Sequence, residues 1–519
     1  MSWERAPSAF RLVAVAVLTL VLSLQAGCTN DAGAHSRAEI LRLSVPESRP
    51  SLQPTGFLGY SIASYGIGEQ LVRPRSDGSM VPWLLESFNR TNPTTWSLRL
   101  RPGIRFHNGA AVDAAAVVAA LERQAKDSFR TDALTTGKLR ATGPLEITLT
   151  TPTPTATVPE DLGGVYRYYV VYDVAAADRA GRDEGKLVDA GIYTGPFRPT
   201  ANDGRRITAT RFDGYWGQAP PWSGLEIIPM PDPQARLSAV RSGEADVALA
   251  PPAEAAVMVE GDHRLEYRAA DLPNHAVYAQ FNAARPPFDD EVVRRAFVLG
   301  IDYQRLARDV AGGRVYTPAR GLYPDGLPFT VYTQRTDTGA AAAILDGAGW
   351  RPGPDGVRVR NGQRLRVTYL HESSRPEHES VGLSLHDQLR PLGFDVALTP
   401  VEDAYDNESW PAEWSITAVS LTLDGNAPAE VIGGWLSHDG LNFGKISDAR
   451  LDRLVDDLRR TDPPQRHQLL RDVQRLVADR AYATVLAFRP TDVVVRSGFD
   501  TFRPDEQFLF FTPTSPAGG

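Results

Sequence analysis

The sequence predicts an α/β or α+β protein that folds into two or more lobes. Its 519 residues exceed one hydrophobic core, because a single core stops growing at roughly 250–300 residues. Strand and helix patterns are interspersed along the chain, which favours lobes that mix both kinds of element. The hydrophobic content of 42% is usual for a globular protein. The net charge of −8 argues against a nucleic-acid partner, which would favour a basic face.

Periodicity predicts the elements of the first half. Apolar residues alternate with polar ones at the start of 96–109, which is typical of a half-buried strand. Asp113 then caps a predicted helix that runs through Leu121. The segment 205–217 predicts a further strand and an aromatic turn, and 232–250 predicts a helix, a glycine stop and a short strand.

The second half begins with a helix pair over 288–313. We expect a break near Gly300, a cap at Asp302 and a glycine end at Gly312. A strand over 365–370 follows. The polar stretch 371–378 then predicts a solvated loop, because its proline would interrupt a helix and its two histidines lack the spacing of a helical zinc pair.

Three elements are expected near the C-terminus. The segment 448–460 places its leucines and valine on one stripe, which predicts an amphipathic helix. Two prolines end that helix, and another helix is expected over about 465–479. The apolar stretch 483–497 predicts closing strands.

The N-terminus has the layout of a secretory signal. Arg5 and Arg11 precede an apolar run over 12–24, and small residues stand before Cys28, the only cysteine of the chain. The run is short for a membrane span, which needs about 20 apolar residues. A lone cysteine at this point resembles the lipobox of bacterial lipoproteins, which implies a signal peptide over 1–27, a lipidated Cys28 and a tether over 28–37. An ordinary secreted protein with an incidental cysteine is the alternative.

Motifs typical of enzymes are missing from the sequence. It has no Walker-type or dinucleotide-binding glycine loop, and "GLSLH" (382–386) lacks the second glycine of a nucleophile elbow. No pair of carboxylates stands out as acid and base, and a lone histidine such as His107 is more often packed than catalytic. We therefore expect a protein that is not an enzyme and uses no cofactor and no metal.

Five segments along the chain form a pattern when they are taken together. They are "LRLRPGIRFHNGAAVDAAAVVAALER" (98–123), "TGPFRP" (194–199), 213–248, "YAQFNAARPPFDDEVVRRAFVLGIDYQRL" (278–306) and 345–370. Together they resemble one family, the extracytoplasmic solute-binding proteins of family 5. Each motif alone is weak, but the matches follow the family's order over nearly the whole mature chain. Members serve ATP-driven importers for peptides and, in some branches, nickel or sugars.

The resemblance implies an α/β, two-lobed periplasmic-binding-protein-like fold of type II and of the large cluster C type. Lobe I would contain a sheet domain and a smaller subdomain inserted in it over 77–188, and lobe II would cover 284–483. The sheet domain would combine 38–76, 189–283 and 484–519. Hinges would lie near 282–285 and 483–488, and the lobes would close around a ligand.

The resemblance also implies a ligand-binding aspartate. In peptide-binding members an aspartate of lobe II, four residues before a proline, pairs with the α-amino group of the peptide, and Asp424 and Pro428 match that spacing. A buried ammonium needs such a partner, and a fixed carboxylate supplies a charge-assisted hydrogen bond. A turn aspartate that binds its own backbone is the alternative. The chain lacks the aromatic residue that usually precedes this aspartate.

Seven further residues are candidates for the cleft. Arg375 and His378 occupy the stretch where some short-peptide binders place an arginine for the ligand carboxylate. Tyr60 and Tyr65 lie where lobe I usually lines the cleft. The remaining candidates follow the Asp424 loop: Trp435, Asn442 and Phe443.

The leading hypothesis is a lipid-anchored receptor of a peptide importer on the extracytoplasmic face of the cell membrane. It would be a monomer that delivers peptides to the permease and ATPase subunits of an ABC transporter. The alternatives are the same fold holding a metal chelate, haem or a sugar, and a non-transport regulator of the cell envelope.

Overall fold

A computed structural model describes most of the chain from Ile40 onward, and these residues belong to one compact unit. The described residues are 40–54, 58–75, 79–128, 132–163, 169–310, 315–403, 406, 408–422, 442–463, 465–499, 501–504 and 510–511. Within these ranges no helix combines the length and the apolar character that a membrane crossing requires.

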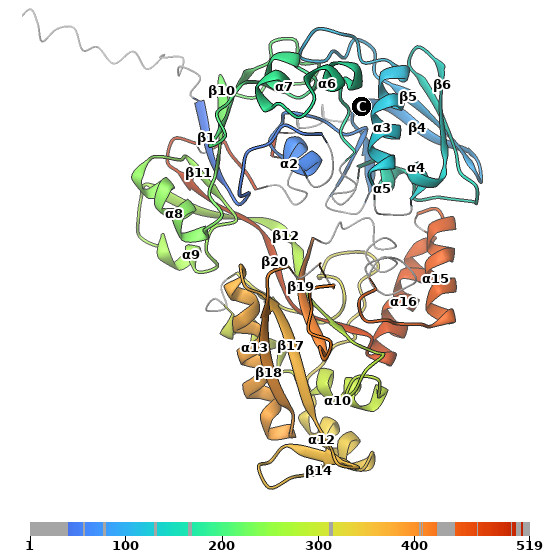
Figure 1. The fold of residues 1–519 in the computed structure, drawn as a ribbon, viewed down its shortest axis with the longest axis vertical. Helices are drawn as coiled ribbons and strands as arrows, with labels where there is room; N and C mark the ends of the chain where they lie inside the picture. Colours follow the sequence, from blue (N-terminus) through green and yellow to red (C-terminus); the bar gives the residue numbers. More distant parts are fainter. Residues whose placement is uncertain are drawn as a thin grey trace, which may run out of the picture. The chain divides into compact units, whose positions relative to one another are not determined.

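Eleven strands of the described chain form one mixed sheet (Figure 1). Its order is β18-β17-β19-β12-β20-β11-β1-β10-β9-β8, and β13 pairs with β20 beside this path. The strands are β1 (Ile40–Val45), β8 (Phe197–Asn202), β9 (Ile207–Arg211), β10 (Gly224–Pro229), β11 (Val247–Leu249), β12 (Leu265–Phe281), β13 (Thr317–Pro318), β17 (Arg366–Glu372), β18 (Asp395–Val401), β19 (Ile416–Thr422) and β20 (Ala483–Arg496).

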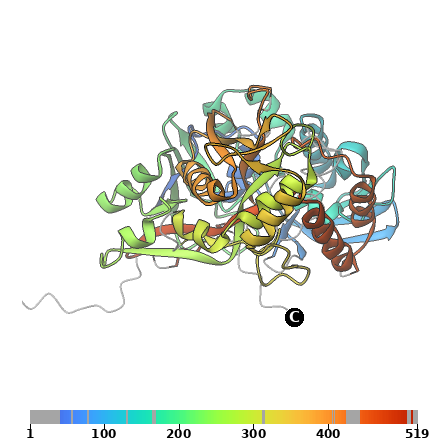
Figure 2. The same cartoon turned by 90° about the horizontal axis from the view of Figure 1, so that it is seen from below.

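The long antiparallel strands β12 and β20 connect the two halves of this sheet, and they run side by side in both views (Figure 1 and Figure 2). Near one end β20 also pairs with β11, and near the other end β12 also pairs with β19. Their register is irregular between Ala269 and His275, where β12 lies opposite Arg489–Asp492. The segment with irregular register is therefore the junction between the two halves.

A second sheet of four antiparallel strands has the order β4-β5-β7-β6, and α3 packs against β6 and β7. In β5 the alternating residues Trp96, Leu98 and Leu100 are buried, which confirms the predicted half-buried strand. Asp113 caps α3 by accepting from the backbone N–H of Ala116, as predicted. The elements are β4 (Leu85–Asn92), β5 (Thr95–Leu100), β6 (Lys138–Gly143), β7 (Glu146–Thr150), α3 (Ala114–Lys126), α4 (Ala133–Thr136) and α5 (Val158–Gly163).

The remaining elements are short strands and helices. The strands are β2 (Val72–Pro74), β3 (Met80–Pro82), β14 (Arg351–Pro352), β15 (Arg358–Arg360) and β16 (Gln363–Arg364). The helices of the first half are α2 (Leu58–Ser64), α6 (Val174–Ala180), α7 (Glu184–Ala190), α8 (Pro233–Ser242) and α9 (Ala255–Met258). Those of the second half are α10 (Glu291–Gly300), α11 (Tyr303–Asp309), α12 (Thr338–Gly347), α13 (Pro376–Leu389), the 3₁₀ helix η2 (Arg390–Leu392), α15 (Ala449–Arg460) and α16 (Arg466–Arg480).

Separate hydrophobic cores lie on the two sides of the junction. The second-lobe core includes Val277, Phe297, Leu385 and Leu470. A second core packs β1, β9 and β10 with residues of α6 and α7. The four-strand core, which includes Leu98, belongs to the second sheet. The predicted domain boundaries and hinges stay predictions.

The structure differs from the sequence prediction at two helix ends. The predicted loop over 371–378 is wrong in its last residues, because α13 begins at Pro376. Proline is favoured at the first helical position, where its missing N–H costs no hydrogen bond. The second helix of 288–313 is capped by Asp302 as predicted, but it ends at Asp309, before Gly312, and Gly312 lies outside the described residues. The helices over 448–460 and 465–479 are confirmed as α15 and α16.

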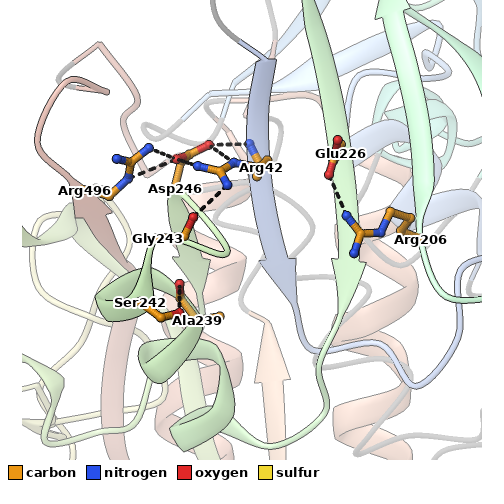
Figure 3. A network of polar contacts seen from close by, with 8 residues as sticks. All are labelled: Arg42, Arg206, Glu226, Ala239, Ser242, Gly243, Asp246 and Arg496. Carbon is orange, nitrogen blue, oxygen red and sulfur yellow. Dashed lines mark hydrogen bonds and ion pairs between the residues drawn. The ribbon is translucent and has the colours of Figure 1, made fainter.

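A buried carboxylate connects three strands of the large sheet (Figure 3). Asp246, just before β11, is fully buried and accepts hydrogen bonds from the backbone N and the guanidinium of Arg42 in β1, at 2.7–3.0 Å. It also accepts from Arg496 in β20 through Nε (3.1 Å) and Nη2. Asp246 therefore cross-links the sheet between β1 and β20.

Candidate functional site

Charged side chains gather at the junction of β12 and β20. Arg489 of β20 donates from Nη2 to both carboxylate oxygens of Asp492, at 2.8 and 2.9 Å, and to the carbonyl oxygen of Pro251 at 3.0 Å. Tyr267 of β12 donates to the same carboxylate at 3.0 Å. We call Arg236, Tyr267, Arg489 and Asp492 the junction cluster.

Arg236 of α8 joins this cluster through the loop before α9. Its guanidinium donates to the carbonyl oxygens of Met230 (2.5 Å), Pro231 (2.8 Å) and Ala250 (2.5 Å). The next carbonyl along the chain is that of Pro251, which accepts from Arg489. Burial lowers the pKa of Arg236 to about 10, and the negative charge of Glu47 opposes this effect. The two guanidinium groups are therefore neighbours on one side of the junction.

The pKa of Arg489 lies above its usual value. Burial is the largest single influence and acts to lower this pKa, but the charges and hydrogen bonds of Asp492 and Tyr316 together raise it by more. The side chains of Arg489 and Asp492 are only 15% and 3% exposed, so water screens their attraction weakly. The positive charge of Arg489 and the negative charge of Asp492 are thus held side by side at the junction.

Glu47 follows β1 and lies on a small pocket of the first half. Its Oε1 accepts from the hydroxyls of Ser61 (2.7 Å) and Tyr65 (2.6 Å). Its Oε2 is buried and has no hydrogen-bond partner among the described residues. The pocket has space for about one water molecule. Its lining residues are Val45, Glu47, Arg49, Pro50, Ser51, Ser61, Ile62, Tyr65, Ile67, Ile207, Ile227 and Pro229.

Arg375 approaches the junction from the second half. It is the N-cap residue of α13, and it forms ion pairs with Glu372 (3.1 Å) and Glu377 (3.8 Å). His275 of β12 lies opposite Arg489 in the strand register. Burial lowers the pKa of His275 to about 3, and the positive charges of Arg489 and Arg375 add to this effect. The structure therefore brings Arg375 close to the junction cluster.

Two of the predicted site residues lie near this junction: Tyr65 through its hydrogen bond to Glu47 and its proximity to Arg236, and Arg375 through its proximity to His275. His378 does not reach a surface: it is buried in α13, and its Nε2 is 2.8 Å from the hydroxyl oxygen of Ser420 in β19. Burial lowers the pKa of His378 to about 3. This geometry gives His378 a packing role, and its predicted contact with a ligand stays a prediction.

Asn442 and Phe443 form local contacts. The side-chain amide of Asn442 donates to the carbonyl oxygen of Ile446 (2.7 Å), and its oxygen accepts from the N–H of Ile446 (3.0 Å). Phe443 is buried against Trp410, with ring centroids 5.0 Å apart. Cys28, Asp424 and Trp435 lie outside the described residues, as does the side chain of Tyr60.

Sequence reasoning missed Glu47, Arg236 and the Arg489–Asp492 pair. The one local signal was the charged "RPTD" inside the predicted closing strands, because charges in an apolar strand need partners. Glu47 and Arg236 gave no such signal. Within the described ranges, no group of three or more His, Cys, Asp and Glu residues is arranged to hold a metal ion.

Comparison with known proteins identifies the class. The chain superimposes on the structure of NikA from Brucella suis in complex with Fe(III)-EDTA with a TM-score of 0.78 and 21% identity, covering 91% of this chain and 99% of that chain. It superimposes on the oligopeptide-binding protein AppA from Bacillus subtilis in complex with a nonapeptide with a TM-score of 0.71 and 17% identity, covering 91% and 96%. The fold is thus that of the two-lobed periplasmic binding proteins, as the sequence predicted.

The sequence profile of the bacterial extracellular solute-binding proteins, family 5 Middle, matches residues 79–443. The chain therefore belongs to this family, whose members are solute-binding components of ABC transporters, and the resemblance found in the sequence is confirmed. Protein XP55 from Streptomyces lividans is 26% identical over 504 residues, which cover 92% of this chain and 88% of that protein.

Proposed function

We propose that the chain captures short peptides in the cleft between its lobes and delivers them to the permease of an ABC importer. The supporting observation is that charged groups of both signs meet at the junction from both halves of the chain. Glu47, from the first half, lies near enough to Arg236 for its carboxylate to raise the pKa of that guanidinium, and Arg375, from the second half, lies near enough to His275 for its positive charge to lower the pKa of that imidazole. A peptide carries an ammonium at one end and a carboxylate at the other, so it can match both groups.

Recognition in this proposal relies on the ends and the backbone of the peptide. Asp424 accepts the α-ammonium group, and Arg375 meets the carboxylate of a short ligand. The Oε2 atom of Glu47, which lacks a hydrogen-bond partner among the described residues, is a second acceptor for the ligand. Backbone pairing in the style of an added strand would leave side-chain preference broad.

Calorimetry with peptides tests this proposal. The probes are a set of tripeptides and one nonapeptide, each with a free N-terminus and as its N-acetyl derivative. We expect acetylation to abolish binding, because it removes the charge that a recessed carboxylate recognises. Asp424→Asn is expected to weaken binding by about 1.5–3 kcal/mol, the range for a hydrogen bond to a charged group. Asp178→Asn, at an exposed ion pair with Arg123, is the control and should bind like the parent.

Two results would overturn the peptide assignment. Equal binding of free and acetylated peptides would exclude the role of Asp424. Binding of a metal chelate such as Fe(III)-EDTA, the compound in the NikA structure, without binding of any peptide would favour the metal-chelate alternative.

We also propose that the mature protein is held at the membrane through a lipid on Cys28. Replacing Cys28 by Ser is expected to move the protein from the membrane fraction to the soluble fraction, since the cysteine is the only thiol that can be acylated. Fractionation of the host cells followed by immunoblotting measures this change. An unchanged distribution would contradict the lipid anchor.

A further inference from the structure

A buried ion pair joins the body of the four-stranded sheet to the second lobe. Glu160 lies in α5, whose Val158 and Leu162 pack in the four-strand core. Arg466 is the first residue of α16, which packs in the second-lobe core. Nη1 of Arg466 donates to Oε1 of Glu160 at 2.7 Å, and the two side chains are only 4% and 6% exposed. The pair thus connects two bodies that have separate cores.

Two further contacts join the same two bodies. The backbone N–H of Ala156 donates to the carbonyl oxygen of Arg459 at 2.6 Å. Arg90 of β4 donates from Nη1 to both carboxylate oxygens of Asp462, at 3.1 Å, and the Asp462 side chain is 59% exposed. All of these contacts join the same two bodies, so separation of the bodies would break them together.

The hydrogen bonding of the buried pair is incomplete. Oε2 of Glu160 and Nε of Arg466 are buried and have no hydrogen-bond partner within the described chain. Burial raises the pKa of Glu160, and the positive charge of Arg466 opposes this effect. An intact buried ion pair often adds little net stability, but removal of one partner is costly because the other charge stays buried. The contact between the two bodies therefore depends on the presence of both charges.

We propose that Glu160 and Arg466 act as a clasp that holds the lobes closed and becomes hydrated when they open. The clasp lies apart from the junction cluster, and its action does not depend on which solute the cleft holds. Because separation exposes both charges to water, the open form needs no pairing. The equilibrium between the closed and the open arrangement of the lobes then depends on the ion pair between Glu160 and Arg466.

Pulsed electron paramagnetic resonance on the ligand-free full-length chain tests the clasp. Spin labels are attached at the exposed positions Glu122→Cys and Arg475→Cys, in a background in which Cys28 is replaced by Ser. The parent is expected to show a population at short distance, since the Glu160–Arg466 pair is formed in the structure. Glu160→Gln is expected to reduce the ratio of short-distance to long-distance populations by roughly tenfold or more, because Arg466 would be left buried without its charge partner.

A double variant and a matched control distinguish the clasp from ordinary damage. Glu160→Leu combined with Arg466→Met removes both charges and is expected to recover the short-distance population. Asp462→Asn weakens a contact between the same bodies whose carboxylate is 59% exposed, and it is expected to change the ratio by less than about fivefold. Circular dichroism checks that each variant is folded. If Glu160→Gln does not fold, Arg466→Lys is measured in its place; it keeps the positive charge and is expected to keep the short distance.

Three outcomes would overturn the proposal. The first is a parent with only the long distance, and the second is a folded Glu160→Gln variant with the distances of the parent. The third is a double variant as open as the single one, because the effect would then not come from an uncompensated charge.

Discussion

Asp246→Ala is expected to lower the free energy of unfolding by about 3 kcal/mol, the low end of the range for breaking a buried ion pair, because the guanidinium groups left behind, at 30% and 34% exposed, are partly solvated by water. The carboxylate is fully buried and receives hydrogen bonds from Arg42 and Arg496, which come from different strands of the large sheet (Figure 3). Its loss leaves both guanidinium groups without their shared partner. Urea denaturation of the variant and the parent measures the difference.

The matched control lies on the same sheet. Glu226 of β10 forms an ion pair with Arg206 at 2.9 Å, and the two side chains are 21% and 41% exposed (Figure 3). Glu226→Ala is expected to cost about 0.2–1 kcal/mol, because water screens the pair and can solvate the remaining guanidinium. If the two alanine variants lost equal stability, Asp246 would not cross-link the strands as its contacts indicate.

The local sequence pattern was enough to predict many of the helices and strands. The alternation in β5, the cap at Asp113 and the apolar stripe of α15 each depend on neighbours in the sequence, and all three were predicted correctly. Pro376 shows where this reasoning fails, because proline both interrupts helices and begins them. The sequence alone did not reveal that another helix starts at this proline.

The candidate site was harder to predict because its contacts join residues far apart in the chain. Arg489 lies in a predicted strand, but its neighbours His275 and Arg375 come from segments that only the register of β12 and the position of α13 bring near. The family resemblance directed attention to Tyr65 and Arg375, which lie at the junction. It gave no indication of Glu47 or of the clasp, because those side chains acquire their roles from the packing of the two halves.

Glu69→Gln is expected to remove a pH dependence of the stability. Glu69 is buried, and it accepts hydrogen bonds from the ring N–H of Trp83 (2.9 Å), from the hydroxyl of Tyr215 (2.8 Å) and from the ring N–H of Trp216 (3.1 and 3.2 Å). Burial raises its pKa from 4.5 to about 7, although these hydrogen bonds lower it in part. The folded chain therefore holds a proton on Glu69 that the unfolded chain releases at lower pH.

The sign of the effect follows from this raised pKa. The stability that protonated Glu69 contributes is fully present below about pH 4.5 and is lost as the pH rises through about 7. The difference between the folded and unfolded pKa values makes this loss on the order of 3 kcal/mol, because a tenfold change in an acid dissociation constant corresponds to about 1.4 kcal/mol. Glutamine has a similar shape but does not ionise, and it can still present its oxygen to the three donors. The variant is therefore expected to lack this component of the pH dependence.

Comparison of the two proteins at the same pH isolates Glu69 from the other titrating groups. His107, for example, acts in the opposite direction: burial lowers its pKa from 6.5 to about 4, so its contribution is lost as the pH falls through this range. Both proteins carry His107, and its effect cancels in the difference between their free energies of unfolding. That difference, measured by urea denaturation at about pH 5 and pH 8, should move in favour of Glu69→Gln as the pH rises. Glu244→Gln, at an exposed position, should show no such trend, and a flat difference for Glu69→Gln would mean that the buried carboxyl does not titrate in this range.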